Sequence, residues 1–166
     1  MEADFPSAHE AISWAMRRLR TPVKSNPSIY QMGRKSIGFS YCEELGPWDK
    51  VAEAVFILKA VGKVLTPLER TVLQTYFTGG IEQGEQVARW VSREINRDRW
   101  FCLDIVRTWA MERPRHSTQW WAKKYGVGTS TVSRWREEVV KRLDIALQSA
   151  MTGAQQALQE SGHVRH

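Results

Sequence analysis

One stretch of the chain constrains its fold more than any other, because small, glycine and apolar residues recur there at fixed spacing. Ala122 is followed four positions later by Gly126, and apolar residues lie on both sides of this pair. These apolar residues are Trp121, Tyr125, Val127, Val132 and Trp135. Since glycine adopts positive φ at no steric cost and a small residue lets helices approach, the pattern predicts two helices joined by a tight turn between Thr118 and Glu137.

The second of these predicted helices starts among hydroxyl side chains. Gly128 precedes a run that can cap the exposed helix amides, and this run is Thr129, Ser130 and Thr131. Val132 and Trp135 take the inward positions of the helix. Ser133 and Arg134 are therefore expected to face solvent. A small, polar and positive helix face suits a DNA major groove, where arginine pairs with O6 and N7 of guanine.

The predicted DNA contacts fall into two groups. We expect the second helix to contact base edges, and the flanking basic residues to contact phosphates, which position a protein without specifying sequence. The predicted DNA-binding residues are Arg115, Thr118, Lys123, Lys124, Thr129, Ser130, Thr131, Ser133, Arg134 and Arg136. The alternative interpretation is an ordinary helical hairpin with its charges on a solvated face.

Composition agrees with an acidic partner without requiring one. The 166 residues include 24 Lys and Arg against 18 Asp and Glu, which gives a net charge of +6. Cys42 and Cys102 lie far apart without metal-ligand spacing, so we expect reduced thiols and a cytoplasmic protein. The most apolar stretch, Ala54 to Leu65, is too short to span a bilayer, and the N-terminus lacks a signal-peptide pattern. We expect no membrane contact.

Elsewhere the apolar residues recur at helical spacing, and no stretch shows the alternation typical of strands. The sequence therefore predicts an all-α fold, a multi-helix bundle with a C-terminal helix-turn-helix. Thr66 and Glu69 have the spacing of a capping box and predict a helix that begins at Pro67. The other predicted helices are Ala8 to Leu19, Trp48 to Gly62, and two helices within Glu85 to Met111 interrupted near Asn96 to Arg99.

Four parts of the chain are predicted. They are a basic N-terminal helix with an irregular connection (1–46), a helical core (47–113), the helix-turn-helix and its following helix (114–152), and a flexible tail (153–166). The following helix carries an apolar stripe up to Gly153, formed by Val139, Leu143, Leu147 and Ala150. This stripe is expected to pack on the chain's own bundle or on a second copy, and a homodimer would bind paired half-sites.

Two segments resemble known regulators of transcription. The spacing of Ala122, Gly126 and Val132, with the run Thr129 to Trp135, resembles the recognition unit of phage and bacterial helix-turn-helix regulators. The segment Leu65 to Leu73 resembles the opening helix of sigma-factor region 4. The order of these parts is similar to phage late-gene regulators and antiterminators. The resemblance implies a role in transcription, with RNA polymerase as a candidate second partner beside double-stranded DNA.

Other kinds of site receive less support. No histidine has the neighbours of a catalytic set, and no glycine-rich phosphate loop is present, so we expect neither an enzyme nor a cofactor. Glu94, Asp98 and Asp104 have nearby arginines, and salt bridges explain them better than a nuclease metal site. An aromatic platform for single-stranded nucleic acid is an alternative interpretation, but helix amphipathicity explains the same residues: Arg97, Arg99, Trp100 and Phe101.

Three functions follow from these observations. The leading prediction is a sequence-specific transcription regulator of phage or mobile-element type, acting as an activator or an antiterminator. The alternative is a DNA-packaging protein, similar to a small terminase subunit, or a replication accessory protein that uses the same motif. A nuclease or recombinase is a third interpretation, and it requires metal-dependent cleavage.

Overall fold

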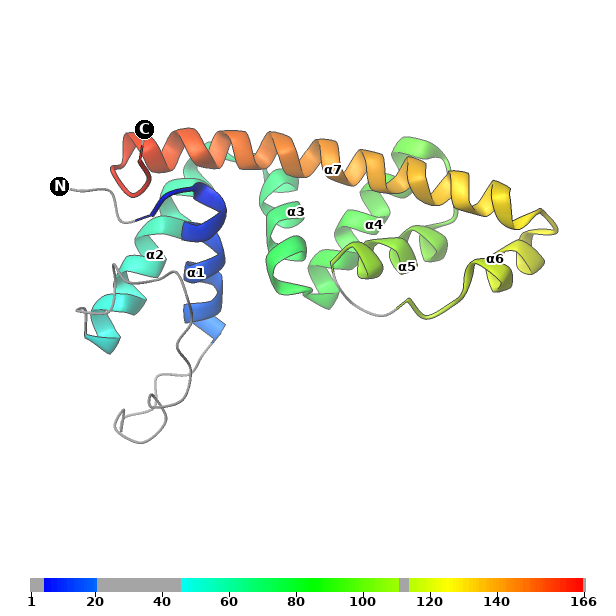
Figure 1. Ribbon diagram of the computed structural model, residues 1–166, viewed down its shortest axis with the longest axis horizontal. Helices are drawn as coiled ribbons and strands as arrows, with labels where there is room; N and C mark the ends of the chain where they lie inside the picture. The colour runs from blue at the N-terminus through cyan, green and yellow to red at the C-terminus, as the bar shows by residue number, and fades with distance from the viewer. Residues whose placement is uncertain (1–4, 21–45, 111–113, 166) are drawn as a thin grey trace. The chain divides into compact units, whose positions relative to one another are not determined.

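The computed structural model describes residues 5–20, 46–110 and 114–165, and these form seven α-helices and no strand (Figure 1). The helices are α1 (Ala8–Arg20), α2 (Pro47–Val64), α3 (Pro67–Thr78), α4 (Ile81–Ile95), α5 (Arg99–Trp109), α6 (Thr118–Tyr125) and α7 (Thr129–Glu160). The predicted all-α class is confirmed for this part of the chain. The irregular connection predicted from Thr21 lies outside the described residues up to residue 45.

The chain divides into two compact units, residues 1–64 with 153–166 and residues 65–152. The predicted boundaries differ from this division, because α2 groups with the N-terminal helix and not with the helices that follow it. The prediction of a flexible tail from residue 153 is wrong. Helix α7 continues through Gly153 to Glu160, and Leu158 and Val164 are buried beyond that glycine.

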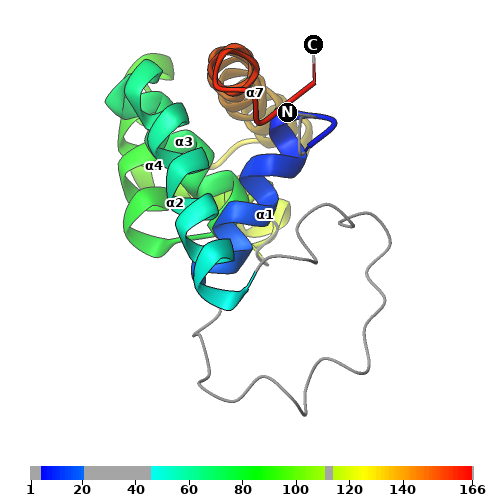
Figure 2. The ribbon, with the colours of Figure 1, turned by 90° about the vertical axis from the view of Figure 1, so that its left-hand side faces the viewer.

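The first unit is built from α1, α2 and the C-terminal end of α7 (Figure 2). Its core residues are Phe5, Ala11, Ile12, Ala15, Ala54, Ile57, Val61, Ala154 and Leu158. Polar contacts join its ends: the Ala8 amide donates to Oε1 of Gln155 at 2.8 Å, and His163 Nδ1 lies 3.0 Å from Oε1 of Glu53. The C-terminal residues are thus held by both packing and hydrogen bonds.

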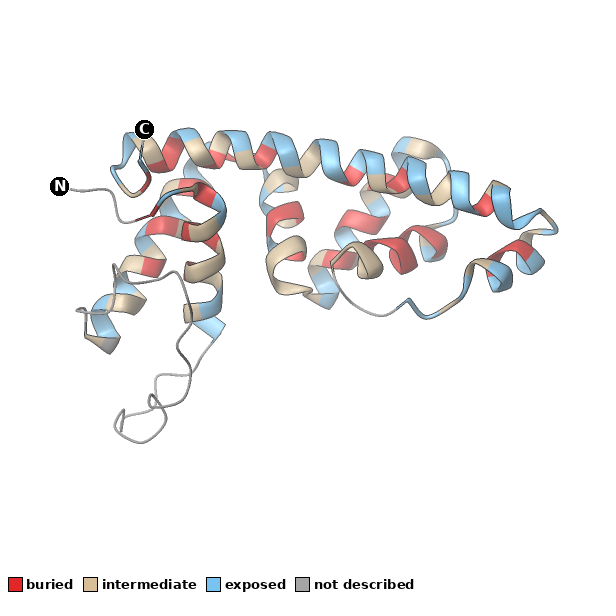
Figure 3. Cartoon of the chain, in the orientation of Figure 1, coloured by how far each residue is buried: buried red, intermediate tan, exposed pale blue. Residues whose placement is uncertain are grey.

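The second unit contains α3 to α6 and the N-terminal part of α7. Buried residues from all five helices meet in its core, as the red segments in Figure 3 show. They include Val72, Val87, Val91, Phe101, Val106, Trp121, Val132, Val139 and Leu143. Val139, Leu143 and Ala150 of the predicted stripe are buried within the chain's own fold. A homodimer would therefore have to use another surface.

The start of α3 follows the predicted capping box. The Glu69 amide donates to Thr66 Oγ1 at 3.2 Å, and the Thr66 amide donates back to Glu69 Oε2 at 2.9 Å. Ser149 on α7 donates to the other carboxylate oxygen at 2.8 Å. The hydrogen bond from the Thr66 amide has the largest effect on the pKa of the Glu69 carboxyl. This bond and the hydrogen bond from Ser149 both lower the pKa. The carboxylate therefore starts one helix and joins it to another.

The predicted interruption between α4 and α5 is confirmed. Asn96 ends α4 with a left-handed backbone, at φ 51°. Asp98 then begins α5, because its Oδ1 accepts from the amides of Trp100 at 2.6 Å and Phe101 at 3.3 Å. Asp98 is therefore an N-cap, and the predicted salt bridge to a neighbouring arginine is wrong for this residue. An N-cap carboxylate accepts the amides that the first helical turn leaves unpaired.

Candidate functional site

The segment from Ser117 to Glu137 contains α6, a tight turn and the start of α7, as the spacing between Thr118 and Glu137 predicted. Ser117 caps α6 by accepting from the Trp120 amide at 3.1 Å. Gly126 ends the helix at φ 65°, a left-handed conformation that favours glycine, and the Val127 amide donates to the Ala122 carbonyl at 3.0 Å. We call this the α6–α7 segment.

One side of the α6–α7 segment is buried against the rest of the second unit. Trp121, Ala122 and Val132 are buried, and three further residues of the pattern are partly buried against the same core: Tyr125, Val127 and Trp135. Phe101 on α5 lies among three of these rings, with centroids 5.4 Å from Trp121, 6.2 Å from Tyr125 and 6.1 Å from Trp135. Such edge-on aromatic contacts stabilise a packing arrangement beyond the area that they bury.

The opposite side of α7 carries the residues predicted to contact bases. Ser130, Ser133 and Arg134 are exposed, and their spacing of three and four residues places them on one face of the helix. Thr129 is also exposed, whereas Thr131 is half-buried. No described residue forms a hydrogen bond or ion pair with the Arg134 guanidinium. The structure thus leaves a small, polar and positive face at the start of α7.

The residues predicted to contact phosphates fall into two groups. Some are exposed, and others have side chains that contact residues of the protein. Arg115 and Lys123 are exposed. Arg136 donates from Nη1 to Thr118 Oγ1 at 2.9 Å, which joins α7 to the first turn of α6. The Lys124 ammonium lies over aromatic rings, with Nζ to centroid distances of 5.3, 4.8 and 5.7 Å for Trp120, Trp121 and Tyr125. Arg136 and Thr118 therefore have a structural contact that the sequence did not indicate.

A buried carboxylate holds the segment that precedes α6. Asp104 is only 6% exposed, and its Oδ1 accepts from the Arg115 amide at 2.6 Å. Its Oδ2 accepts from the His116 amide at 3.1 Å and from the indole Nε1 of Trp121 at 2.9 Å. The expected arginine salt bridge is wrong for Asp104 too, because amide and indole donors occupy its oxygens. This burial was not predicted, although the position of a lone carboxylate within the apolar run Phe101 to Val106 could have indicated it.

A hollow of about 150 Å³ lies beside this carboxylate. Its lining residues come from α5, α6 and the segment before α6: Trp100, Leu103, Asp104, Arg107, Arg115, His116, Trp120, Trp121 and Lys124. The His116 ring stacks on Trp120, with centroids 3.8 Å apart and an interplanar angle of 26°. The hollow thus combines indole surfaces with cationic side chains.

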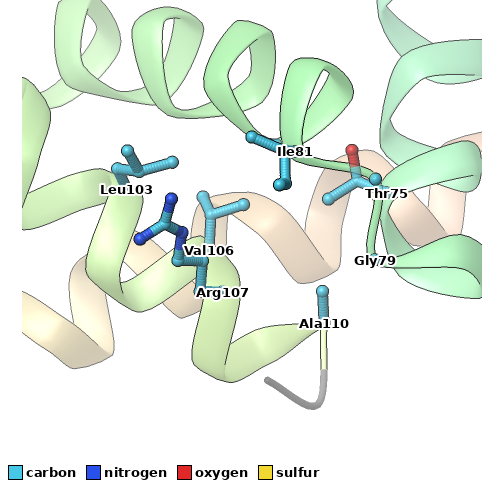
Figure 4. Close-up of a pocket in the computed structure, with 9 residues that line it drawn as sticks. Thr75, Gly79, Ile81, Leu103, Val106, Arg107 and Ala110 are labelled. Atoms are coloured by element: carbon cyan, nitrogen blue, oxygen red, sulfur yellow. The ribbon is translucent and has the colours of Figure 1, made fainter. Parts of the chain in front are cut away.

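A second pocket lies between the α3–α4 turn and α5, lined by Thr75, Ile81, Val106 and Arg107 among others (Figure 4). Its volume is about 10 Å³. That is room for a single water molecule at most. This pocket is therefore no candidate for a ligand site.

Further findings limit the chemistry of the described residues. They contain no group of three His, Cys, Asp or Glu side chains placed to hold a metal ion. None of their helices combines the length and apolar character needed to cross a bilayer. Cys102 is a buried free thiol, and burial raises its pKa to about 12, with a smaller contribution from Asp98. A thiol in this state is not a nucleophile at neutral pH.

Comparison with protein-family models, curated protein sequences and solved structures finds no match to this chain. The site is therefore interpreted from its own geometry and chemistry.

Proposed function

We propose that the chain is a sequence-specific regulator of transcription that binds double-stranded DNA through the α6–α7 segment. In this proposal the segment is a helix-turn-helix, and the N-terminal end of α7 enters the major groove. One observation carries the proposal: buried Val132 fixes the helix, while Ser133 and Arg134 beside it are exposed. Short hydroxyl side chains allow close approach to the base pairs, and Arg134 supplies a bidentate donor for guanine.

The cations around the segment support the same proposal. Lys123 on α6 and Arg115 before it are exposed, and the chain as a whole carries a net charge of +6. Exposed cations beside a recognition helix are suited to phosphate contacts, which position a protein on the duplex without specifying sequence. Lys124 stays beside the aromatic rings and supplies positive potential from there.

The proposed link to transcription depends on the resemblance of Leu65 to Leu73 to sigma-factor region 4. This segment contains the start of α3, where the capping box holds the first turn and leaves Arg70 exposed. We propose that α3 is the surface offered to RNA polymerase. Duplex recognition by α7 does not depend on this part of the proposal.

Selection from a pool of random duplexes, followed by sequencing, tests duplex recognition. The wild-type chain is expected to enrich one sequence, and Arg134→Ala is expected to lose preference at one base pair. The loss corresponds to about 1–3 kcal/mol of discrimination, which is about 5-fold to 150-fold in relative affinity. Lys123→Ala is expected to weaken all duplexes alike and to reduce the salt slope by about one.

Arg142→Ala is the matched control, because Arg142 is an exposed arginine about two turns further along the same helix. It is expected to retain the wild-type preference. If Arg134→Ala enriches the same sequence as wild type with the same affinity, α7 does not read the groove through this residue. A wild-type chain that enriches no sequence contradicts sequence-specific binding altogether.

A further inference from the structure

The hollow beside α6 exposes two large indole rings. Trp100 is 58% exposed and Trp120 is 43% exposed, although other tryptophans of the same unit pack into its core. The ring of Trp120 is held in place by its stack on His116. Exposed aromatic surface held in a fixed orientation is suited to stacking with another flat ring.

The lining of the hollow is positively charged. Arg107, Arg115 and Lys124 contribute cations, and Asp104 is the one carboxylate among the lining residues. Its two oxygens already accept three hydrogen bonds from the protein, so most of its capacity as an acceptor is used within the fold. Arg99 lies near the hollow, with its guanidinium 5.6 Å from the Trp100 ring, and it forms an ion pair with Glu85 at 3.4 Å.

We propose that this hollow binds an unpaired nucleotide of a single-stranded nucleic acid. The base stacks on the exposed indoles of Trp100 and Trp120, and its phosphates are neutralised by the arginines of the hollow. Stacking needs a free base face, which a base within an intact duplex does not offer. The site is therefore different from the groove-reading face of α7, and this inference does not rest on the proposed duplex recognition.

This site differs from the single-strand platform considered from the sequence. Phe101, a member of that platform, is 1% exposed and lies in the core. Arg97, another member, places its guanidinium 4.5 Å from the Trp135 ring. Trp100 is instead joined by Trp120, which is 20 positions further along the chain. The fold thus assembles the site from α5 and α6.

Fluorescence anisotropy with labelled hexathymidylate and hexauridylate tests the inference on the full chain. Trp100→Ala and Trp120→Ala are each expected to weaken binding of the strand about tenfold, a typical value for the loss of one stacking contact. Arg107→Gln is expected to reduce the salt slope by about 0.7, the value for one phosphate contact on a single strand. The two oligonucleotides show whether the site accepts strands of both DNA and RNA.

Controls separate stacking from loss of fold and from duplex binding. Trp48→Ala removes a tryptophan that is 74% exposed in the first unit and is expected to leave strand binding unchanged. Trp120→Phe retains an aromatic face and is expected to recover most of the affinity that Trp120→Ala loses. Arg134→Ala is expected to bind the strand with wild-type affinity. A loss of duplex recognition can therefore be distinguished from a loss of strand binding.

Three results would overturn the inference. The first is a wild-type chain that binds neither oligonucleotide at low salt. The second is wild-type affinity for the strand in folded Trp100→Ala and Trp120→Ala, with folding checked by circular dichroism. The third is a six-base-pair duplex that competes as well as the single strand, because the interaction would then be with phosphates alone.

Discussion

Replacement of Asp104 by asparagine isolates the contribution of one buried carboxylate to the site. The carboxylate accepts from three donors, the amides of Arg115 and His116 and the indole of Trp121. Asparagine has nearly the same size but offers one carbonyl oxygen and one NH2 group. Whichever way the amide is oriented, at least one protein N–H then faces another N–H.

The cost follows from the number of hydrogen bonds affected. With the asparagine carbonyl at the Oδ2 position, the bonds from His116 and Trp121 remain but lose their charge, and the Arg115 amide loses its acceptor. A bond to a charged acceptor contributes about 1 kcal/mol more than a neutral one, and a buried unpaired donor costs about 1–3 kcal/mol. We expect Asp104→Asn to lower the free energy of unfolding by about 3 kcal/mol. For a chain of this length, that lowers the melting temperature by about 10 °C.

Urea and thermal unfolding followed by circular dichroism measure this change, and Asp98→Asn is the control. Asp98 undergoes the same chemical change at an exposed N-cap, where asparagine caps a helix about as well as aspartate. We expect this control to remain within about 0.5 kcal/mol of wild type, the range of ordinary surface substitutions. The reasoning is refuted if the two variants lose equal stability, or if the free energy of unfolding of Asp104→Asn equals that of wild type.

Two further predictions concern Gly126 and Cys102. Gly126→Ala is expected to lower the free energy of unfolding by about 1 kcal/mol, because alanine is strained at φ 65°, whereas Gly126→Asn costs less; equal losses in urea melts would contradict this. In a Cys42→Ser background, the thiol of Cys102, with a pKa of about 12, is expected to react with thiol reagents at pH 8.5 only after unfolding. Because this pKa is raised on folding, its contribution to stability is fully present below about pH 9 and falls by about 1.4 kcal/mol per pH unit between about pH 9 and pH 12. Rapid labelling of the folded chain, or the same alkaline slope in Cys102→Ala, would contradict the assignment.

Features set by local sequence were predictable. The capping box at Thr66 and Glu69, the turn at Gly126 and the break near Asn96 each depend on residues within one helical turn of one another. The end of α7 was not predictable in the same way. A glycine inside a helix costs only about 1 kcal/mol relative to alanine. Burial of residues beyond it, such as Leu158, outweighs that cost and carries the helix through Gly153.

Features of the site that depend on distant residues were missed. Asp104 accepts from residues 11 to 17 positions away, so its partners follow from the packing of α5 against the segment before α6. The charge pattern alone favoured nearby arginines. The aromatic environment of Lys124 likewise needs the ring orientations, which spacing does not supply. Exposure of Ser133 and Arg134 was predictable, because burial of Val132 on the same helix determines which way they face.

Arg134 and Arg136 lie on the same helix but have different surroundings. Two residues two positions apart on an α-helix point in directions about 200° apart, so both cannot enter the same groove. Arg136 donates to Thr118 and holds α7 against the first turn of α6, while Arg134 lies on the exposed face with Ser130 and Ser133. The sequence assigned both arginines to DNA. Under the proposed function, this geometry supports Arg134 as the residue that contacts bases, whereas the contact with Thr118 gives Arg136 a structural role.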